Sequence, residues 1–358
     1  MPSLKEIKGR INSISSTLAI TSAMKMVAAA KLQKAQMAIQ NMLPYERRLY
    51  SMLLDLMGAM NISAAASEDG SVRGSGSAER GFDQSGDRLS LSNRHDLAGM
   101  EGAYSLMAQR QVHRVAIVAF ASNSSLCGAF NSNVIREATA VINEYRASGL
   151  GDADITVYSV GRKMAEAMRK LGFPSPADFT KMSDSPSYEA ASALAQELLD
   201  GFVSGRFDKV ELVYNHYKST SSQPTTRQTY LPLSLADATA DIQVGKITDS
   251  ASESDTNRGA EPVGAPVVRQ GSPTTEDLIV EPSKEALIAT LLPKVIRLRI
   301  FTTLLDSAAA EHAARTVAMQ LATDNGNDLL QELTLEYNKG RQQKITSEIL
   351  DLVGGSMQ

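Results

Sequence analysis

The sequence predicts an α/β protein in which the N- and C-terminal helices form a long antiparallel coiled coil, with an α/β domain inserted between them. Two observations predict the coil. Residues 3–57 carry no turn cluster, and no loop signal interrupts residues 283–353 after Pro293. Both segments repeat apolar residues in alternating steps of three and four, the period of a coiled coil. The third observation is an alternation of short apolar runs with helical patterns in residues 111–282, which predicts a mostly parallel sheet covered by helices.

The N-terminal coiled-coil helix is predicted in residues 1–60. Ser3 followed by Glu6 forms a capping box that fixes its start. An alanine-rich segment follows, and its small side chains let two helices approach closely. Pro44 is expected to bend this helix rather than to end it, because the apolar spacing resumes after it.

Charge and cysteine content restrict the class of protein. The net charge of the 358 residues is −4, but residues 1–48 carry eight Lys and Arg against two Glu, a local charge of +6. This basic helix is expected either to face acidic surfaces or to be a solvated face. The single cysteine excludes an internal disulfide and gives no support for a metal site. Charged residues interrupt the N-terminal apolar pattern and no apolar run approaches eighteen residues, so we expect a soluble protein of a reducing compartment, without signal peptide or membrane span.

The segment between the terminal helices divides into insertions and a domain. Residues 61–110 are a low-complexity insertion rich in Ser, Gly, Asp and Arg. Residues 111–282 are predicted as a Rossmann-like α/β domain, with a second flexible insertion at residues 236–275. Strands are expected at residues 112–121, 155–160, 209–217, 225–233 and 277–281, and helices at residues 162–171, at 187–204 and in a segment ending near 147. Pro224 marks the fourth strand as an edge strand, and Ser185 with Pro186 is expected to cap the last of these helices.

The C-terminal coiled-coil helix is predicted in residues 283–358, after a break at Pro282 and a cap at Ser283. Its seam is expected at Leu298, Phe301, Leu305, Ala308, His312, Arg315, Met319, Ala322, Gly326, Leu329 and Leu333. His312 and Arg315 are polar at seam positions, as is Lys25 in the first helix. They either specify the register of the coil or contact a third protein that surrounds it.

The sequence offers no catalytic set, no metal site and no cofactor site. The segment SNSSLCGAFN, residues 122–131, lies between a strand and a helix, where a doubly wound fold would bind a phosphate. It matches neither phosphate-binding glycine motif, and only Gly128 lies in the turn, so a structural turn is the favoured interpretation. Cys127 is expected to be a small buried residue rather than a nucleophile.

Two segments identify a family resemblance. Residues 11–36, INSISSTLAITSAMKMVAAAKLQKAQ, resemble the N-terminal signature of the gamma subunit of F-type (F1Fo) ATP synthases, bacterial type, and residues 311–355 resemble its C-terminal signature. SLCGAFN, LVYNHYKS, LIVEPSKEAL and LLPKVIRLRIFTTLLDSAAAEH are similar to intervening blocks of the family, in the same order. The resemblance leaves out the two insertions.

The chain also departs from the family pattern. The family loop usually reads SDRGLCGGFN, whereas Asn123, Ser124, Ser125 and Ala129 stand here at its acidic, basic and glycine positions. The insertion at residues 236–275 falls where chloroplast members carry a regulatory dithiol, but it contains no cysteine, so that switch cannot operate. Both insertions are interpreted either as latches against reverse rotation or, preferably, as tolerated surface loops.

The resemblance implies a non-catalytic rotor shaft without cofactors. The coil would stand inside a ring of three alpha and three beta subunits, and its base would join the epsilon subunit and the membrane ring of c subunits, with one copy per complex. Ion-driven rotation of the c-ring would then drive the conformational cycle of the beta subunits and ATP synthesis or hydrolysis. The chain would be peripheral, on the cytoplasmic face of the bacterial inner membrane, without direct membrane insertion and without nucleic-acid partners.

The resemblance also implies contact residues. Met24, Lys25 and Arg315 match the neck of the family's coil, where it meets an acidic loop of the catalytic subunit. Further positions match those that contact the ring near its upper bearing: Arg341, Gln342, Thr346 and Glu348. The last apolar residues would form a hydrophobic bearing tip: Ile345, Ile349, Leu350 and Leu352.

Two other classes of function stay open at this stage. One is a nucleotide-dependent enzyme built on the α/β domain, which would need nucleotide bound to the isolated chain. The other is a free-standing coiled-coil scaffold, which would form homodimers.

Overall fold

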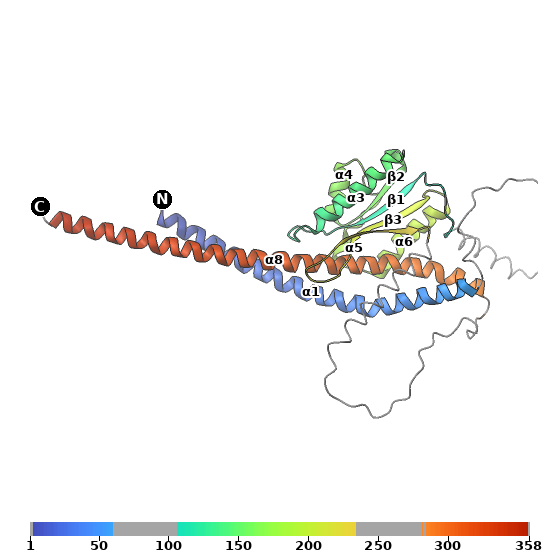
Figure 1. Cartoon of the computed structure of the whole chain (residues 1–358), viewed down its shortest axis with the longest axis horizontal. Coiled ribbons are helices and arrows are strands. Elements are labelled where there is room, and N and C mark those ends of the chain that lie inside the picture. Colours follow the sequence, from blue (N-terminus) through green and yellow to red (C-terminus); the bar gives the residue numbers. More distant parts are fainter. Residues whose placement is uncertain (1–2, 60–105, 234–280, 282–283, 357–358) are drawn as a thin grey trace, which may run out of the picture.

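The computed structural model describes residues 3–59, 106–233, 281 and 284–356. Two helices dominate it: α1, Leu4–Ala59, and α8, Lys284–Ser356. At 1.5 Å per residue they are about 84 Å and about 110 Å long. They lie side by side and antiparallel, so both chain termini lie at one end, and the α/β domain packs against the other half of the pair (Figure 1). The predicted pairing of the two ends of the chain is therefore confirmed.

Four strands form one sheet: β1 (Val115–Phe120), β2 (Ile155–Val160), β3 (Lys209–Asn215) and β4 (Thr225–Leu231). Their order is β2-β1-β3-β4, with β1 parallel to β2 and β3, and β4 antiparallel to β3. Every residue of β1 is buried, as expected for a central parallel strand covered on both faces. The four corresponding predicted strands, including the edge strand, are confirmed. Residues 277–280 of the predicted fifth strand, and nearly all of both insertions, lie outside the described residues.

Helices cover both faces of this sheet. On one face lie α3 (Phe130–Ala147) and α4 (Arg162–Lys170), which share a buried apolar cluster with the sheet. On the other face lie α6 (Tyr188–Val203) and the base of α8, which share a larger cluster with it. Two short helices, η2 (Asp152–Asp154) and α5 (Thr180–Asp184), were not predicted.

The predicted cap of α6 was wrong. The Ser187 hydroxyl, not that of Ser185, accepts the Ala190 N–H at 3.3 Å. Ser187 has the extended backbone that an N-cap residue needs, so the helix starts after it rather than at Pro186. At the start of α1, by contrast, Ser3 Oγ accepts the Glu6 N–H at 3.3 Å, as half of the predicted capping box requires.

The seam of the coil follows the 3–4 alternation along the whole of α1. Its buried or half-buried positions are Ile7, Ile11, Ile14, Leu18, Thr21, Lys25, Ala28, Leu32, Ala35, Ile39, Met42, Glu46, Leu49, Leu53 and Leu56. The helix continues through Pro44 without a break, as predicted. The polar position predicted for Lys25 is confirmed, whereas Glu46 is a polar seam residue that was not predicted.

The predicted seam of α8 is only partly right. Met319, Gly326 and Leu333 face α1, but Ala322 and Leu329 are exposed, and Thr323 and Leu330 occupy the intervening positions. The Thr323 hydroxyl lies 3.1 Å from the Thr21 hydroxyl across the seam. A Cβ on Gly326 would lie 2.7 Å from a Leu18 methyl group, so a glycine permits this close approach of the helices.

The outer end of α8 has no helical partner in α1. The last seam contact is between Leu4 and Gly340, where an added Cβ would lie 3.2 Å from the Leu4 side chain. Residues 341–356 then continue as a single helix of about 24 Å, which projects beyond the N-terminus in Figure 1. Within the described part of the chain, no helix combines the length and the apolar character needed to cross a membrane.

Candidate functional site

The single-helix tip of α8 presents two kinds of side chain to solvent. Residues 341–350 are all exposed, including Arg341 and Gln342. The apolar residues predicted for the tip are exposed to unusual extents: Ile345 47%, Ile349 54%, Leu350 65% and Leu352 74%. Spacings of four and three put Ile345, Ile349 and Leu352 on one face of the helix. An apolar stripe without a cover is typical of a binding surface.

The polar residues of the tip are held by local contacts. The Thr346 hydroxyl donates to the Gln342 carbonyl at 2.9 Å, and Lys344 lies 3.7 Å from the Glu348 carboxylate, one turn on. This ion pair is exposed, so it contributes little to stability. The structure thus brings Thr346 and Gln342 together on one helix and leaves the carboxylate of Glu348 and the amide of Gln342 facing outward.

The neck, where the coil leaves the α/β domain, holds Met24 and Lys25 on α1. Both are half-buried, and the adjacent Met26 and Val27 are 66% and 57% exposed. Lys31 is exposed one to two turns further along the same helix. The neck therefore combines a flexible apolar surface with positive charge.

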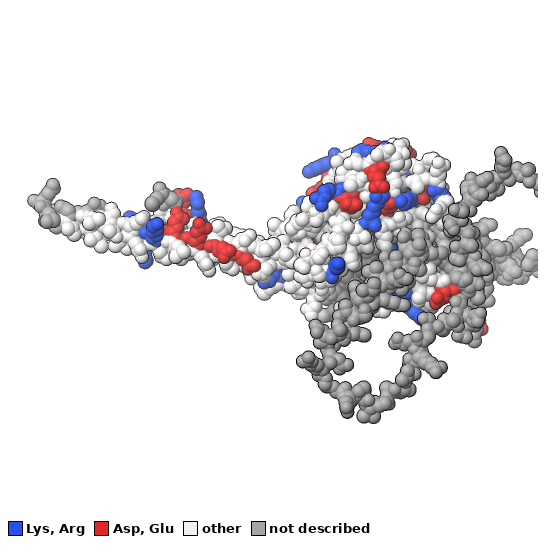
Figure 2. Space-filling view, in the orientation of Figure 1, with Lys and Arg blue, Asp and Glu red and all other residues white. Residues whose placement is uncertain are grey.

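Positive charge does not extend over the coil as a whole. Figure 2 shows acidic side chains gathered along the coil between the domain and the tip. Four acidic residues of α8 are exposed there at steps of four: Asp324, Asp328, Glu332 and Glu336. The excess of +6 belongs to α1, and the expectation of a basic rod holds for that helix alone.

Arg315 faces the domain rather than the seam, so the seam position predicted for it was wrong. Its guanidinium donates to Glu311 Oε1 at 2.7 Å and to Ser124 Oγ at 2.7 Å, and its side chain is 11% exposed. Ser124 stands where the family loop usually carries its basic residue.

Burial shifts the pKa values of Glu311 and His312, which lie one turn before Arg315 on α8. Burial raises the pKa of Glu311, while the charge and hydrogen bond of Arg315 act in the opposite direction. Burial, with the charges of Arg315 and Lys31, lowers the pKa of His312 to about 4. His312 is therefore neutral at pH 7, and its buried Nδ1 has no hydrogen-bond partner among the described residues. Sequence reasoning missed Glu311, although its spacing of four from Arg315 was a signal for an ion pair.

Three further contacts tie the domain to both helices of the coil. Asp306 of α8 accepts the backbone N–H of Tyr217 at 2.9 Å and lies 2.6 Å from His216 Nδ1. Gln36 of α1 donates to the Tyr217 hydroxyl at 2.5 Å. The segment after β3 is thus held by α1 and α8 together, so the domain and the coil form one connected body.

The loop between β1 and α3 is a structural turn. Asn131 Oδ1 accepts from the Ser122 backbone and hydroxyl, both at 3.0 Å, and the Asn123 side chain donates to the Thr180 carbonyl at 2.7 Å. Cys127 is 1% exposed and lies 3.1 Å from Asn131 Nδ2, which confirms the prediction of a buried cysteine. The side chains of Ser122, Asn123 and Asn131 are thus used in contacts within the chain.

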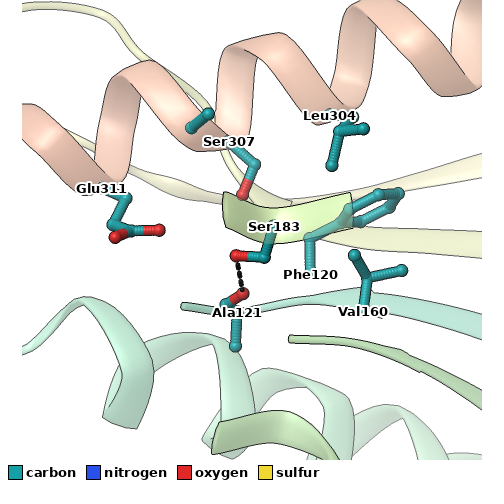
Figure 3. Close-up of a pocket in the computed structure, with 8 residues that line it drawn as sticks. Phe120, Ala121, Val160, Ser183, Leu304, Ser307 and Glu311 are labelled. Atoms are coloured by element: carbon teal, nitrogen blue, oxygen red, sulfur yellow. Dashed lines mark hydrogen bonds between the residues drawn. The ribbon is translucent and has the colours of Figure 1, made fainter. Parts of the chain in front are cut away.

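The carboxyl ends of β1 and β2 face α8 instead of open solvent. Doubly wound sheets bind ligands in the crevice outside the carboxyl ends of their strands. Here the space between α8 and the ends of Phe120 and Val160 is a cavity of about 10 Å³, far too small for a nucleotide (Figure 3). The coil occupies the place where a nucleotide-dependent enzyme would bind its ligand.

These features define a class of protein: a stiff helical shaft whose α/β domain is fixed at its base and whose far end is a bare helix. A family model described as "ATP synthase" matches residues 3–357. The ATP synthase gamma chain of Phocaeicola vulgatus is 47% identical over 357 residues, with 100% of each chain covered. That of Flavobacterium johnsoniae is 35% identical, with 99% of this chain and 98% of the relative covered.

A solved structure has the same fold. The chain superposes with a TM-score of 0.51 on one from the rotor of the Euglena gracilis mitochondrial ATP synthase, at 19% identity, covering 96% of this chain and 98% of that one. The present chain belongs to the family of bacterial ATP synthase gamma chains.

Proposed function

We propose that this chain transmits torque between the membrane ring of c subunits and the catalytic beta subunits. In this proposal the coil stands inside the ring of three alpha and three beta subunits, and the α/β domain with the base of the coil joins the epsilon subunit and the c-ring. One copy serves each complex, bound peripherally at the cytoplasmic face of the inner membrane. Ion flow turns the c-ring, and the shaft turns with it.

The physical basis is linkage between rotation and beta-subunit conformation. A shaft that contacts three beta conformations unequally changes their relative free energies when it turns. Each beta subunit then binds ADP and phosphate, closes, and releases ATP in turn. Two properties are needed, an asymmetric surface and resistance to twist. The unequal lengths of α1 and α8 supply the first, and the continuous seam supplies the second.

The observation that carries the proposal is the bare tip of α8. A single helix with an apolar stripe is unstable in water unless something covers it. A hydrophobic sleeve inside the ring is an occupant that fits Ile345, Ile349, Leu350 and Leu352. Arg341 and Gln342, about one turn nearer the coil than Ile345, would make directional hydrogen bonds to the sleeve's rim. Thr346 and Glu348, which lie among the apolar residues, would add to these.

The neck supplies the second proposed contact. The acidic loop of a beta subunit would meet Lys25, with Met24 and its exposed neighbours as the apolar part of the surface. Arg315 would act here through Ser124 and Glu311, because its guanidinium is already bound within the chain.

The test is the double substitution Arg341→Ala with Gln342→Ala in the intact ATP synthase. Both side chains are exposed, so we expect assembly and thermal stability to be unchanged. ATP synthesis driven by an ion gradient in membrane vesicles should fall several-fold. The matched control is Arg136→Ala with Asn133→Ala, which removes an exposed arginine and a half-buried amide from α3. Wild-type synthesis by the tip variant, or an equal loss in the control, would count against the assignment.

A further inference from the structure

The cavity between α8 and the sheet has an unusual polar lining. It lies beside the carboxyl ends of β1 and β2, at the point where the coil and the domain are in contact, and has a volume of about 10 Å³. That is about the smallest space that holds one water molecule. Figure 3 shows Ser307 and Glu311 projecting from α8 toward Ser183 of α5.

Ser307 has a hydroxyl that makes no hydrogen bond to the described residues. The residue is 6% exposed and lines the cavity. Ser307 Oγ is not among the fully buried atoms that lack a partner, so it is open to the cavity. The Ser307 side chain points into the cavity, where a small polar molecule could accept its hydrogen bond.

The other two polar side chains of the cavity, Ser183 and Glu311, can each accept a hydrogen bond. Ser183 donates its proton to the Ala121 carbonyl at 3.0 Å, so the lone pairs of its oxygen remain able to accept. Glu311 is 7% exposed, and Arg315 binds its Oε1, which leaves Oε2 to accept a further hydrogen bond. The cavity thus presents one donor, Ser307, and two acceptors.

We propose that this cavity binds one ordered water molecule that joins α8 to α5. The water accepts from the Ser307 hydroxyl and donates to Ser183 Oγ and Glu311 Oε2. Three hydrogen bonds are the usual number for a buried water. A cation fits less well, because the Arg315 guanidinium lies 2.7 Å from the same carboxylate and the Ser307 proton would have to turn away.

The water has a structural consequence at the base of the coil. It connects the shaft helix to α5 and, through Ser183, to the end of β1. It also supplies Glu311 with a second hydrogen bond, and so supports the carboxylate that holds Arg315 against Ser124. The inference concerns a binding site within this chain and does not rest on rotation.

The test is a density map of the assembled ATP synthase at a resolution that shows ordered waters. We expect a peak within about 2.6–3.2 Å of Ser307 Oγ, Ser183 Oγ and a Glu311 oxygen. The peak should be lost in Ser307→Ala and kept in Ser307→Thr, which restores the hydroxyl. The matched control is Ser204→Ala at the end of α6, which should keep the peak.

Three results would overturn the proposal. One is an empty cavity in a wild-type map that shows other buried waters. The second is a peak that persists unchanged in Ser307→Ala. The third is an anomalous signal in the cavity after thallium ions are added, because that would show a site for a monovalent cation instead of a water.

Discussion

Replacing Arg315 by methionine tests whether this residue fastens the shaft to its base. Methionine keeps much of the aliphatic bulk and removes the charge. The arginine forms hydrogen bonds of 2.7 Å to both Glu311 and Ser124, and the two charged side chains are only 11% and 10% exposed. The substitution therefore leaves a buried carboxylate without its cation.

The expected loss follows from that burial. Removing one partner of a buried ion pair destabilises proteins by about 3–5 kcal/mol, whereas exposed pairs contribute about 0–1 kcal/mol. We expect about 3 kcal/mol for Arg315→Met, because the cavity beside Glu311 lets the carboxylate keep a polar contact. At roughly 2 °C per kcal/mol for a chain of this size, the melting temperature should fall by about 6 °C.

A second-site change distinguishes the ion pair from loss of packing. Glu311→Gln removes the negative charge with little change in shape, so adding it to Arg315→Met should restore most of the lost stability at pH 8. The deficit of Arg315→Met should also shrink as the pH falls. Burial raises the folded-state pKa of Glu311, and losing Arg315 raises it further, so protonation favours the folded state at low pH.

Circular dichroism melting of the full-length chain between pH 5 and pH 8 measures these effects, with Arg136→Met on α3 as the exposed control. A melting temperature of Arg315→Met equal to wild type would refute the reasoning, and would mean that Arg315 is available to another subunit. Equal losses in the single and double variants would show that packing, not charge, accounts for the effect.

Two further predictions concern titratable groups. Glu211 is 1% exposed and bound by Arg227, Lys209 and Tyr145, so Glu211→Ala should cost about 3–5 kcal/mol in chemical denaturation, against at most about 1 kcal/mol for Glu144→Ala. Burial raises the pKa of Glu211, but the hydrogen bonds that the carboxylate accepts outweigh burial, and the pKa is lowered overall. The stability that ionised Glu211 contributes should therefore be lost as the pH falls through the pKa of the folded state. The pKa of His312 is lowered to about 4, so stability should decline between about pH 6.5 and pH 4, and His312→Gln should flatten that decline. A His312 proton resonance that titrates near pH 6.5 would contradict the second prediction.

The architecture was predictable because its periods are long and uninterrupted. In α1, fifteen seam positions keep the 3–4 alternation from Ile7 to Leu56, so the phase can be read at any point. The strands were predictable for a related reason, since β1 and β3 are apolar runs bounded by polar residues. The cap of α6 was not, because Ser185 and Ser187 both have the right side chain and only the backbone chooses between them.

The residues of α8 that face α1 were harder to predict, because the base of α8 packs against both α1 and the α/β domain. Between Leu304 and Ala313 almost every residue is buried, some against α1 and others against the sheet. When buried residues surround a helix on all sides, the apolar spacing does not show which of them face α1. The predicted seam was therefore one residue early at Ala322 and Leu329. Arg315 was misplaced for the same reason. Its partner Ser124 is 191 residues away, and no local pattern connects them.

The coil is asymmetric in a way that its period alone does not reveal. Leu18 packs on Gly326, and Glu46 accepts a hydrogen bond from Thr302. Between these two contacts α1 advances 28 residues and α8 only 24. The difference is about one helical turn, or about 6 Å of helix. The longer path belongs to α1, which contains Pro44 and curves away from the straighter α8 in Figure 1.

A curved helix wound on a straighter one presents a different profile to each direction around the shaft axis. Only a shaft with the same profile in all three directions could turn inside a ring without favouring one beta subunit over another. Unequal paths avoid this, and the contacts of Asp306, Gln36 and Arg315 hold the domain in a fixed direction relative to that curvature. In the function proposed above, rotation of the base would carry the bulge of α1 past each subunit of the ring, as linkage between rotation and catalysis requires.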